Sequence, residues 1–423
     1  MTRAITLAVL IVLAGTASAD ARWSVTTPVS PDRSEGRHVV ASNARGDRAV
    51  AFERRGRLWL ATARPGRRFG KPRRVPGAAD QYYRTPEIAL SPRGDVMLAW
   101  NYFDHFREPD PDIDLRDEGC CYGYRAVIKP ARGRFGPRFA LAPRGRETSF
   151  GGMVIRSPSR FYVAFSARNE ARRRGGVYLR SAAGRRRVGR AEQVVAAPAA
   201  EALDLSIVRG RPRILFTRRY AAPVLESIRL RARRYSRPRR VLGTIERVEP
   251  LRFLTDRRGG QAIVSGDYVY TRGRGRPFRR QRLARRPFEA SYLHLAMARS
   301  GAAAVVWSMP DRTVRISTRR PDGRFRKPRV LWRAPRYLQP NAPQVAVDSR
   351  GRASVIWEVD SRTTRSPRLL LVATVKSSGR RHDVRRLDSQ GYLFTDPLVT
   401  RDDRGRSTAV WNRSSRLWAS YGP

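Results

Sequence analysis

Seven acidic residues gather between positions 101 and 121 of this chain and could bind a cation. Asp110, Asp112 and Asp114 stand at alternate positions, and Glu118 follows them. Carboxylate oxygens are the hard ligands that Ca²⁺ prefers, although the spacing departs from the EF-hand pattern of Gly at the sixth position and Glu at the twelfth. Two interpretations stay open. These four carboxylates form a calcium site, or the acids pair with nearby arginines and the protein needs no cofactor.

The same stretch ends in Cys120 and Cys121, the only cysteines in the sequence. In an oxidising compartment, adjacent cysteines can close into a small strained disulfide ring that stiffens a loop. The alternative is a pair of thiols without a role. Neighbouring cysteines cannot link distant parts of the chain, so stability must come from the core.

Aromatic residues recur in the segments that precede apolar strands, where they could stack on sugar rings, and a nearby arginine could hold an acidic group. The predicted ligand-binding residues are Tyr82, Tyr83, Arg84, Phe150, Tyr292, Tyr337 and Tyr392. The alternative is that each aromatic residue anchors its own loop between neighbouring repeats.

No catalytic motif accompanies these residues. The four histidines are isolated from one another and lack the spacing of a zinc site. Neither a nucleophile elbow, a phosphate-binding loop nor a dinucleotide-binding fingerprint occurs in a strand-to-helix setting. The sequence therefore favours a protein without catalytic activity over an enzyme, and it identifies no catalytic residue.

The elements that position these residues belong to a unit that the sequence repeats eight times. An apolar strand, a polar turn with Gly and a second apolar strand follow one another, and Gly accepts the positive φ of such a turn at little cost. An aromatic residue stands six positions after the Gly in the pairs Gly46 and Phe52, Gly94 and Trp100, Gly210 and Phe216, Gly301 and Trp307, Gly351 and Trp357, and Gly405 and Trp411. A third strand follows, and then a fourth with Pro, which suits an edge strand.

Four strands in each repeat, without helical periodicity, predict an all-β chain that forms a single β-propeller over 20–423, with eight four-stranded blades. Seven blades are the alternative if the weak unit at 250–284 is not a blade. The last unit, 397–421, holds only three strands, and the segment 22–29 resembles the missing fourth. We expect this N-terminal strand to complete the last blade and close the ring.

The chain is strongly basic, with 87 Lys and Arg against 36 Asp and Glu and a formal net charge of +51. Nearly all the basic residues are Arg, spread evenly along the repeats. The even spread favours the codon usage of a GC-rich genome as the cause. The alternative is a polyanionic partner, such as a glycan or another anionic polymer, without specific binding of nucleic acid.

The first 19 residues have the pattern of a secretory signal peptide, with Arg3, an apolar run over 4–15 and the cleavage site Ala17-Ser18-Ala19. The apolar run is too short to span a bilayer, and no later stretch is long enough to do so. We therefore expect a monomer without a transmembrane segment that is secreted or lies on the exterior of the cell envelope.

The repeats and the signal-like start resemble exported β-propeller proteins of actinobacterium-like bacteria, which are loosely sialidase-like. The resemblance covers the chain after residue 19 and implies the architecture only. The sialidase repeat motif has three positions from Gly to Trp where this chain has six, and the sialidase arginines and nucleophile cannot be assigned to residues here. Two functions follow as hypotheses. The first is non-catalytic binding of a glycan or anionic polymer on the loop face of the propeller, and the second is a sialidase-like glycan hydrolase or lyase.

Overall fold

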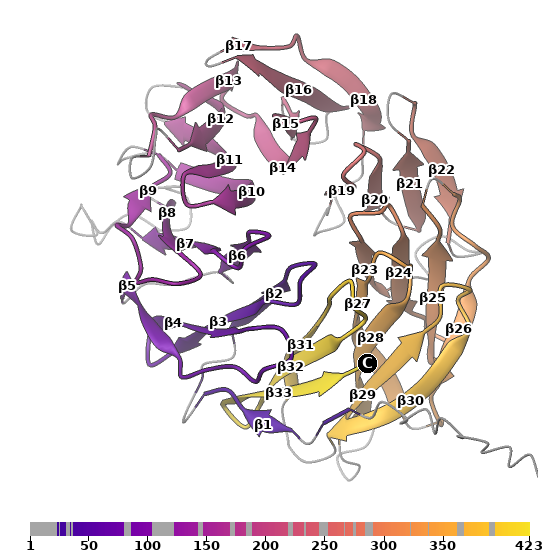
Figure 1. Cartoon of the computed structure of the whole chain (residues 1–423). Coiled ribbons are helices and arrows are strands. Elements are labelled where there is room, and N and C mark those ends of the chain that lie inside the picture. The colour runs from indigo at the N-terminus through magenta and orange to yellow at the C-terminus, as the bar shows by residue number, and fades with distance from the viewer. Residues whose placement is uncertain are drawn as a thin grey trace, which may run out of the picture.

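The repeats form eight antiparallel sheets arranged as blades in a ring, which is an eight-bladed β-propeller (Figure 1). The computed structural model describes residues 23–423 except 25, 31–33, 35–36, 80–85, 104–121, 143–146, 170–173, 183–187, 219–222, 232–233, 245–252, 266, 274–275, 284–290, 322, 337, 362–367 and 389–393. The described residues form strands and turns but no helix, and so none that could cross a membrane. The expected all-β fold and the eight blades are confirmed.

In the first four blades, the strands run from the channel outward in chain order. Blade 1 holds β2 (His38–Ser42), β3 (Arg48–Arg54), β4 (Arg57–Ala63) and β5 (Arg73–Ala79). Blade 2 holds β6 (Glu87–Leu90), β7 (Val96–Phe103), β8 (Tyr122–Lys129) and β9 (Phe139–Ala140). Blade 3 holds β10 (Glu147–Ser157), β11 (Arg160–Asn169), β12 (Arg174–Ser181) and β13 (Glu192–Ala196). Blade 4 holds β14 (Glu201–Val208), β15 (Arg211–Thr217), β16 (Pro223–Arg231) and a divided outer strand, β17 (Arg234–Tyr235) and β18 (Arg239–Thr244).

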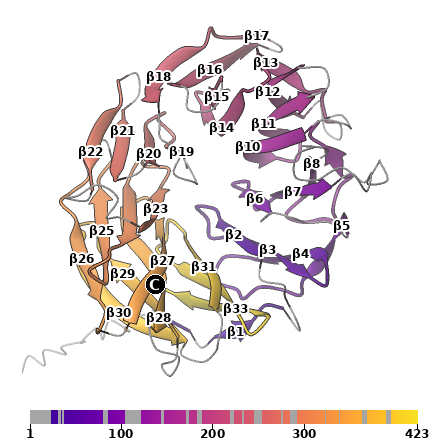
Figure 2. The same ribbon diagram turned by 180° about the vertical axis from the view of Figure 1, so that it is seen from behind.

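The remaining blades continue the ring, and Figure 2 shows them from behind. Blade 5 holds β19 (Phe253–Thr255), β20 (Gln261–Ser265), β21 (Tyr268–Arg272) and β22 (Arg279–Arg282), so the weak unit is a blade. Blade 6 holds β23 (Ser291–Met297), β24 (Ala303–Ser308), β25 (Thr313–Arg319) and β26 (Arg329–Arg333). Blade 7 holds β27 (Leu338–Val347), β28 (Ala353–Ser361), β29 (Leu369–Val375) and β30 (Arg381–Asp388). Blade 8 holds β31 (Phe394–Arg401), β32 (Ser407–Arg413), β33 (Arg416–Gly422) and β1 (Thr27–Pro28).

Blade 8 closes the ring with a strand from the other end of the chain, as the sequence predicts. Thr27 of β1 pairs with Ala419 of β33 in antiparallel register. The Ser24 amide donates a hydrogen bond of 2.7 Å to the Tyr421 carbonyl, and the Ser420 hydroxyl donates one of 2.8 Å to the Ser24 carbonyl. These bonds hold the first and last blades together without a covalent link.

The core lies between the blades. In seven blades the repeated aromatic residue of the second strand is among the largest side chains of this core. Side chains from two neighbouring blades share each apolar cluster, since the second strand is covered on both faces. The repeat aromatics that are at most 2% exposed are Phe52, Trp100, Phe165, Phe216, Trp307, Trp357 and Trp411. Burial of this position in seven blades explains why the sequence keeps its spacing from the turn.

Antiparallel strands that follow one another place alternate connections on opposite faces of the ring. We call the face with the turns between first and second strands, and the loops between third and fourth strands, the Gly-turn face. The opposite face, which carries the loops from one blade to the next, is the interblade-loop face. On the Gly-turn face, the Asn43 side chain of blade 1 donates a 2.9 Å hydrogen bond to the Ser91 carbonyl of blade 2. This contact fixes the two turns that border the site described next.

Candidate functional site: a basic cleft between blades 1 and 2

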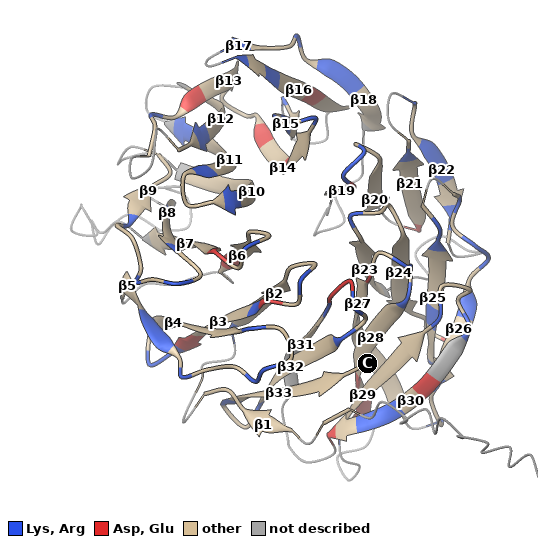
Figure 3. Cartoon of the chain, viewed as in Figure 1, with Lys and Arg blue, Asp and Glu red and all other residues tan. Residues whose placement is uncertain are grey.

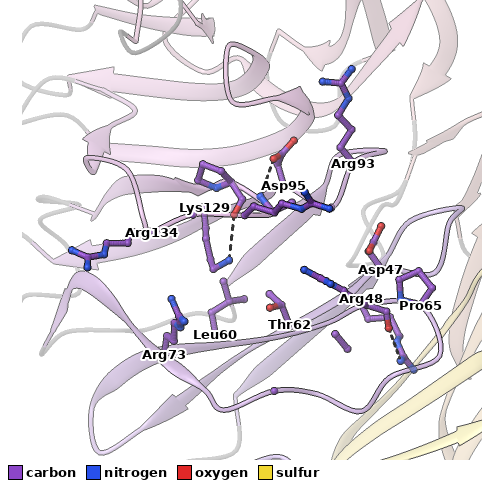
Figure 4. Close-up of a pocket in the computed structure, with 18 of the residues that line it drawn as sticks. Asp47, Arg48, Leu60, Thr62, Pro65, Arg73, Arg93, Asp95, Lys129 and Arg134 are labelled. Atoms are coloured by element: carbon purple, nitrogen blue, oxygen red, sulfur yellow. Dashed lines mark hydrogen bonds between the residues drawn. The ribbon is translucent and has the colours of Figure 1, made fainter.

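A cleft of about 1380 Å³ opens on the Gly-turn face between blades 1 and 2 (Figure 4). Strand β4, the end of β8, the β2–β3 and β6–β7 turns and the β4–β5 and β8–β9 loops form its walls. Two acidic residues, Asp47 and Asp95, line it, and no described lining residue is aromatic. Its basic residues are Arg45, Arg48, Arg64, Lys71, Arg73, Arg93, Lys129, Arg132 and Arg134.

The two carboxylates of the cleft are engaged by the turns that carry them. Asp47 accepts a 3.0 Å hydrogen bond from the side-chain amide of Asn43 and lies 3.9 Å from Nε of the exposed Arg45. Asp95 accepts bonds of 2.7 Å from the Ser91 hydroxyl and 3.0 Å from the backbone amide of Ala131. Because most of these partners are neutral, the carboxylates brace the loops and leave much of the positive charge of the cleft uncompensated.

Glycine keeps this corner of the cleft tight. Gly94 has φ of 89°, which L-residues rarely adopt. A Cβ at this position would lie 3.2 Å from Cγ of Asp47. Gly94 therefore has two roles: it adopts the conformation of the turn, and its lack of a side chain lets blade 2 approach Asp47 of blade 1.

Arg48 is a structural member of the cleft. It begins β3, is 8% exposed, and donates a 2.7 Å hydrogen bond to the Thr408 hydroxyl of blade 8. It also donates to the Arg67 carbonyl of the β4–β5 loop, and its guanidinium lies 4.7 Å from the ring centroid of Tyr421. Burial lowers the pKa of this guanidinium, with the Tyr421 hydroxyl acting in the opposite direction. Arg48 therefore joins blades 8 and 1 and shapes the loop that forms one wall.

Other basic side chains of the cleft are exposed and make no hydrogen bond or ion pair with a described residue. They come from the β4–β5 loop, the start of β5, the β6–β7 turn and the β8–β9 loop: Lys71, Arg73, Arg93, Arg132 and Arg134. Figure 4 shows Arg73 and Arg134 at one side of the cleft and Arg93 at the other. Unpaired cations around a concave surface concentrate positive potential there.

Lys129 differs from these residues because it is buried. It is 8% exposed, and its ammonium donates one hydrogen bond, of 3.3 Å, to the carbonyl of Pro130. Burial lowers the pKa of Lys129, the nearby charge of Arg73 lowers it further, and Asp95 acts in the opposite direction. The base of the cleft thus holds a cation with little local compensation.

Two of the ligand-binding residues predicted from the sequence can be placed, and both lie away from the cleft. The ring of Phe150 on β10 is half-buried and stacks on Tyr124, with 5.8 Å between the centroids. Tyr292 on β23 is 61% exposed, and its φ of 53° is unusual for an aromatic residue. They belong to blades 3 and 6, which are not neighbours in the ring. Their role in binding a ligand stays a prediction.

The remaining predicted residues lie outside the described part of the chain. These are the ligand-binding candidates Tyr82, Tyr83, Arg84, Tyr337 and Tyr392, the calcium candidates Asp110, Asp112, Asp114 and Glu118, and the cysteines Cys120 and Cys121. The predicted signal peptide, 1–19, also lies outside it. These assignments stay predictions.

The sequence interpretation did not identify the cleft. Its local signal is two loop segments, 64–73 and 130–134, which hold several basic residues and no acid. Basic residues occur around the whole ring, however, and also along the outer strands (Figure 3). Only the packing of blade 1 against blade 2 shows which cations share one cavity.

The fold and the cleft define the protein as a β-propeller with a basic interblade site. No family model matches the chain, and no curated protein is detectably similar to it. The solved structures that it resembles include the WD40 domain of SCAP from fission yeast, with 9% identity, coverage of 95% of this chain and 98% of that chain, and a TM-score of 0.50. Prolyl oligopeptidase B from Galerina marginata is 10% identical, and the match covers 90% of this chain and 56% of that chain with a TM-score of 0.50.

A sialidase is also among these structures. The NanB sialidase from Streptococcus pneumoniae is 10% identical over 97% of this chain and 70% of that chain, with a TM-score of 0.37. The neighbours differ in function, and at such identities the similarity shows the propeller fold alone.

Proposed function

We propose that this chain is an exported, non-catalytic binding protein whose ligand is an anionic polymer held in the basic cleft between blades 1 and 2. The observation that carries the proposal is the set of exposed, unpaired cations around one cavity whose two acids are already engaged. A chain of negative charges can neutralise several of these cations at once and release its counterions. The secretory pattern of the first 19 residues supports a ligand outside the cytoplasm, such as an anionic polymer of the cell envelope.

The lining of the cleft favours recognition by charge. Sugar rings and nucleobases are usually held by stacking on aromatic side chains, and no described lining residue is aromatic. A glycan that binds here would therefore be held by its acidic groups. The proposed site lies on the Gly-turn face, whereas the sequence pointed to the interblade-loop face.

The acids of the cleft support binding in preference to hydrolysis. A glycan hydrolase of the common type uses two carboxyl groups on either side of the scissile bond. Among the described lining residues, the only carboxylates are Asp47 and Asp95, and both hold turn or loop groups.

The test compares the loss of two arginines inside and outside the cleft. Residues 20–423 are titrated with inorganic polyphosphate, polygalacturonate and neutral dextran at low and high ionic strength. We expect the double variant Arg93→Ala/Arg134→Ala to weaken polyanion binding roughly tenfold, because two exposed charge contacts of about 0.7 kcal/mol each add up to about 1.4 kcal/mol. The matched control is Arg279→Ala/Arg282→Ala on the exposed outer strand of blade 5, which removes the same charge.

The control decides between a site and a general attraction. An effect of the blade 5 variant below about twofold would support the cleft. Equal losses in both variants would show that the total charge of the protein attracts polyanions, and the proposal would then be wrong.

A further inference from the structure

Lys129 ends the third strand of its blade, a position at which two other blades, 5 and 6, hold a buried arginine with several hydrogen-bond or ionic partners. In blade 5 this residue is Arg272, which donates a 2.6 Å hydrogen bond to Gln261 and pairs with Glu226 of blade 4. In blade 6 it is Arg319, which donates a 2.7 Å bond to the Gly323 carbonyl. These arginines are 7% and 3% exposed and serve the scaffold. Of these three buried cations, Lys129 has the fewest hydrogen bonds and ionic partners among the described residues to account for its burial.

The ammonium group of Lys129 has three donors, and one of them is used, on Pro130. A buried donor without an acceptor is unfavourable, and a buried charge is more so. The charged groups that act on Lys129 are Arg73 from β5 and Asp95 from the β6–β7 turn. Arg48 from β3 and the arginines of the β8–β9 loop line the same cleft. The carboxylate of Asp95 is shared with Ser91 and Ala131 and so compensates Lys129 only in part.

We propose that the buried Lys129 at the base of the cleft and the exposed Arg73 together form a subsite that accepts a phosphate group of the bound polymer. The inference rests on the proposed function and names the chemistry of its ligand. The two cations come from different blades and line the same cleft, where the charge of Arg73 acts on Lys129 (Figure 4). Donors that converge from two blades suit the tetrahedral oxygens of a phosphate group better than the two coplanar oxygens of a carboxylate. Lys and Arg are both common phosphate ligands.

The subsite predicts that the binding energy has two parts: contacts with the exposed arginines, which salt weakens, and the contact with Lys129, which salt weakens less. Mobile ions screen the exposed arginines at the mouth of the cleft, because the Debye length falls to roughly 3 Å at molar salt. A phosphate group against Lys129 is largely shielded from mobile ions, so its contact persists. The part of polyphosphate binding that survives high salt should therefore depend on Lys129.

The experiment measures inorganic polyphosphate binding to Lys129→Met and to the control Lys71→Met, which removes an exposed lysine from the same cleft. At high ionic strength, we expect Lys129→Met to bind about tenfold or more weakly than the parent and Lys71→Met to lose less than about threefold. Lys129→Arg should recover part of the loss because it keeps the charge. Equal losses in the two methionine variants would overturn the subsite.

A second measurement uses the unmodified protein and does not depend on a variant that folds. An amine-acylating reagent is applied with and without polyphosphate, and the modified lysines are identified by mass spectrometry. Polyphosphate should protect Lys129, and unchanged reactivity of Lys129 with the polymer bound would overturn the proposal.

Two further outcomes separate the inferences from one another. If polygalacturonate depends on Lys129 at high salt as strongly as polyphosphate does, the subsite does not select phosphate and that assignment is wrong. If the Arg93→Ala/Arg134→Ala variant weakens binding while Lys129→Met does not, the cleft remains the site and only the subsite fails. If none of these variants changes binding more than its control, the proposed function fails as well.

Discussion

The seam between blades 4 and 5 and the cleft between blades 1 and 2 both contain several charged side chains, but these side chains differ in whether they have partners. In the seam, Arg213 and Arg272 are 5% and 7% exposed. Arg272 pairs with Glu226 across the two blades, and Arg213 donates hydrogen bonds to the Thr255 hydroxyl at 3.1 Å and the Gly259 carbonyl at 3.3 Å. In the cleft, by contrast, the exposed side chains of Arg73, Arg93, Arg132 and Arg134 have no partner among the described residues, and Arg45 alone pairs with Asp47, at 3.9 Å.

The apolar packing of the seam explains its need for paired charges. Its apolar cluster has three buried members among the described residues, Leu215, Val224 and Ile263. The cluster between blades 6 and 7 has fifteen. Hydrogen bonds and an ion pair between blades 4 and 5 therefore supply part of the stabilisation that apolar packing gives to the other blade interfaces.

The comparison shows that the number of arginines does not distinguish a binding surface from a scaffold. What distinguishes them is whether each guanidinium already has an acceptor. Arg213, Arg272 and Arg48 are buried and already donate to groups of neighbouring blades, so they contribute to the net charge without being available to a ligand. Arg93 and Arg134 contribute the same charge and are available.

The largest effect is expected from breaking the ion pair of the seam. Glu226→Gln leaves Arg272 and Arg213 buried with less compensation, and loss of one partner of a buried pair costs about 3 to 5 kcal/mol. Urea unfolding of the parent and the variant measures this loss. The control is Asp311→Asn, which breaks the exposed 2.7 Å pair with Arg315 and should cost less than about 1 kcal/mol. Similar losses in both variants would show that the pair does not hold the seam.

The second prediction concerns Asp204 on β14, which faces the charge of Arg213 at the same seam. Its Oδ2 atom is buried and has no hydrogen-bond partner among the residues that the structure describes. Burial raises the pKa of this carboxyl to about 7, although Arg213 acts in the opposite direction. Because an unfolded Asp titrates near 3.9, the native state binds the proton more tightly, and the stability that this contributes is lost as the pH rises through about 7.

The measurement is the free energy of unfolding at two pH values. Between about pH 5 and about pH 8, the parent should lose about 2.5 kcal/mol more than Asp204→Asn, since the variant lacks the titrating group. The difference between the two proteins removes the contribution of all other titrating groups. Parallel pH profiles would mean that Asp204 is already ionised at acidic pH.

Much of the fold could be predicted from the sequence because its signals are local. The six-residue interval from Gly to the aromatic residue places the turn and the buried side chain in one hairpin, as Gly351 and Trp357 show. The closing strand could be predicted for the same reason, since Thr27 and Pro28 complete a unit whose last strand is missing. The weak unit at 250–284 was uncertain because its second strand lacks the aromatic, yet it forms a complete blade.

The cleft could not be predicted because the pairing of an arginine depends on residues far away in the chain. Arg48 and Arg93 both belong to a Gly turn or its border and look equivalent in the sequence. Arg48 is buried and donates a hydrogen bond to Thr408, 360 positions away, whereas the Arg93 side chain meets no such acceptor in the described part of the chain. The aromatic residues suggested a site on the opposite face, because residues that can stack on a ligand are visible in a short stretch of sequence. A cavity whose positive charges lack acidic partners is not visible there.

The smallest expected effect sharpens the comparison at a single position of the repeat. Lys129 and Arg272 both end the third strand of a blade and are both buried, but among the described residues only Arg272 forms an ion pair. Replacing a poorly compensated buried cation with an apolar residue of similar length removes a desolvation cost, so Lys129→Met should raise the free energy of unfolding by about 1 kcal/mol. Arg272→Met should lower it, because Glu226 then loses its partner. Thermal and urea unfolding of the two variants measure whether the free energy of unfolding rises or falls in each.

A higher free energy of unfolding for Lys129→Met, together with weaker polyphosphate binding, would show that Lys129 serves the ligand at the expense of stability. A loss at Lys129 as large as that at Arg272 would instead place Lys129 in the scaffold.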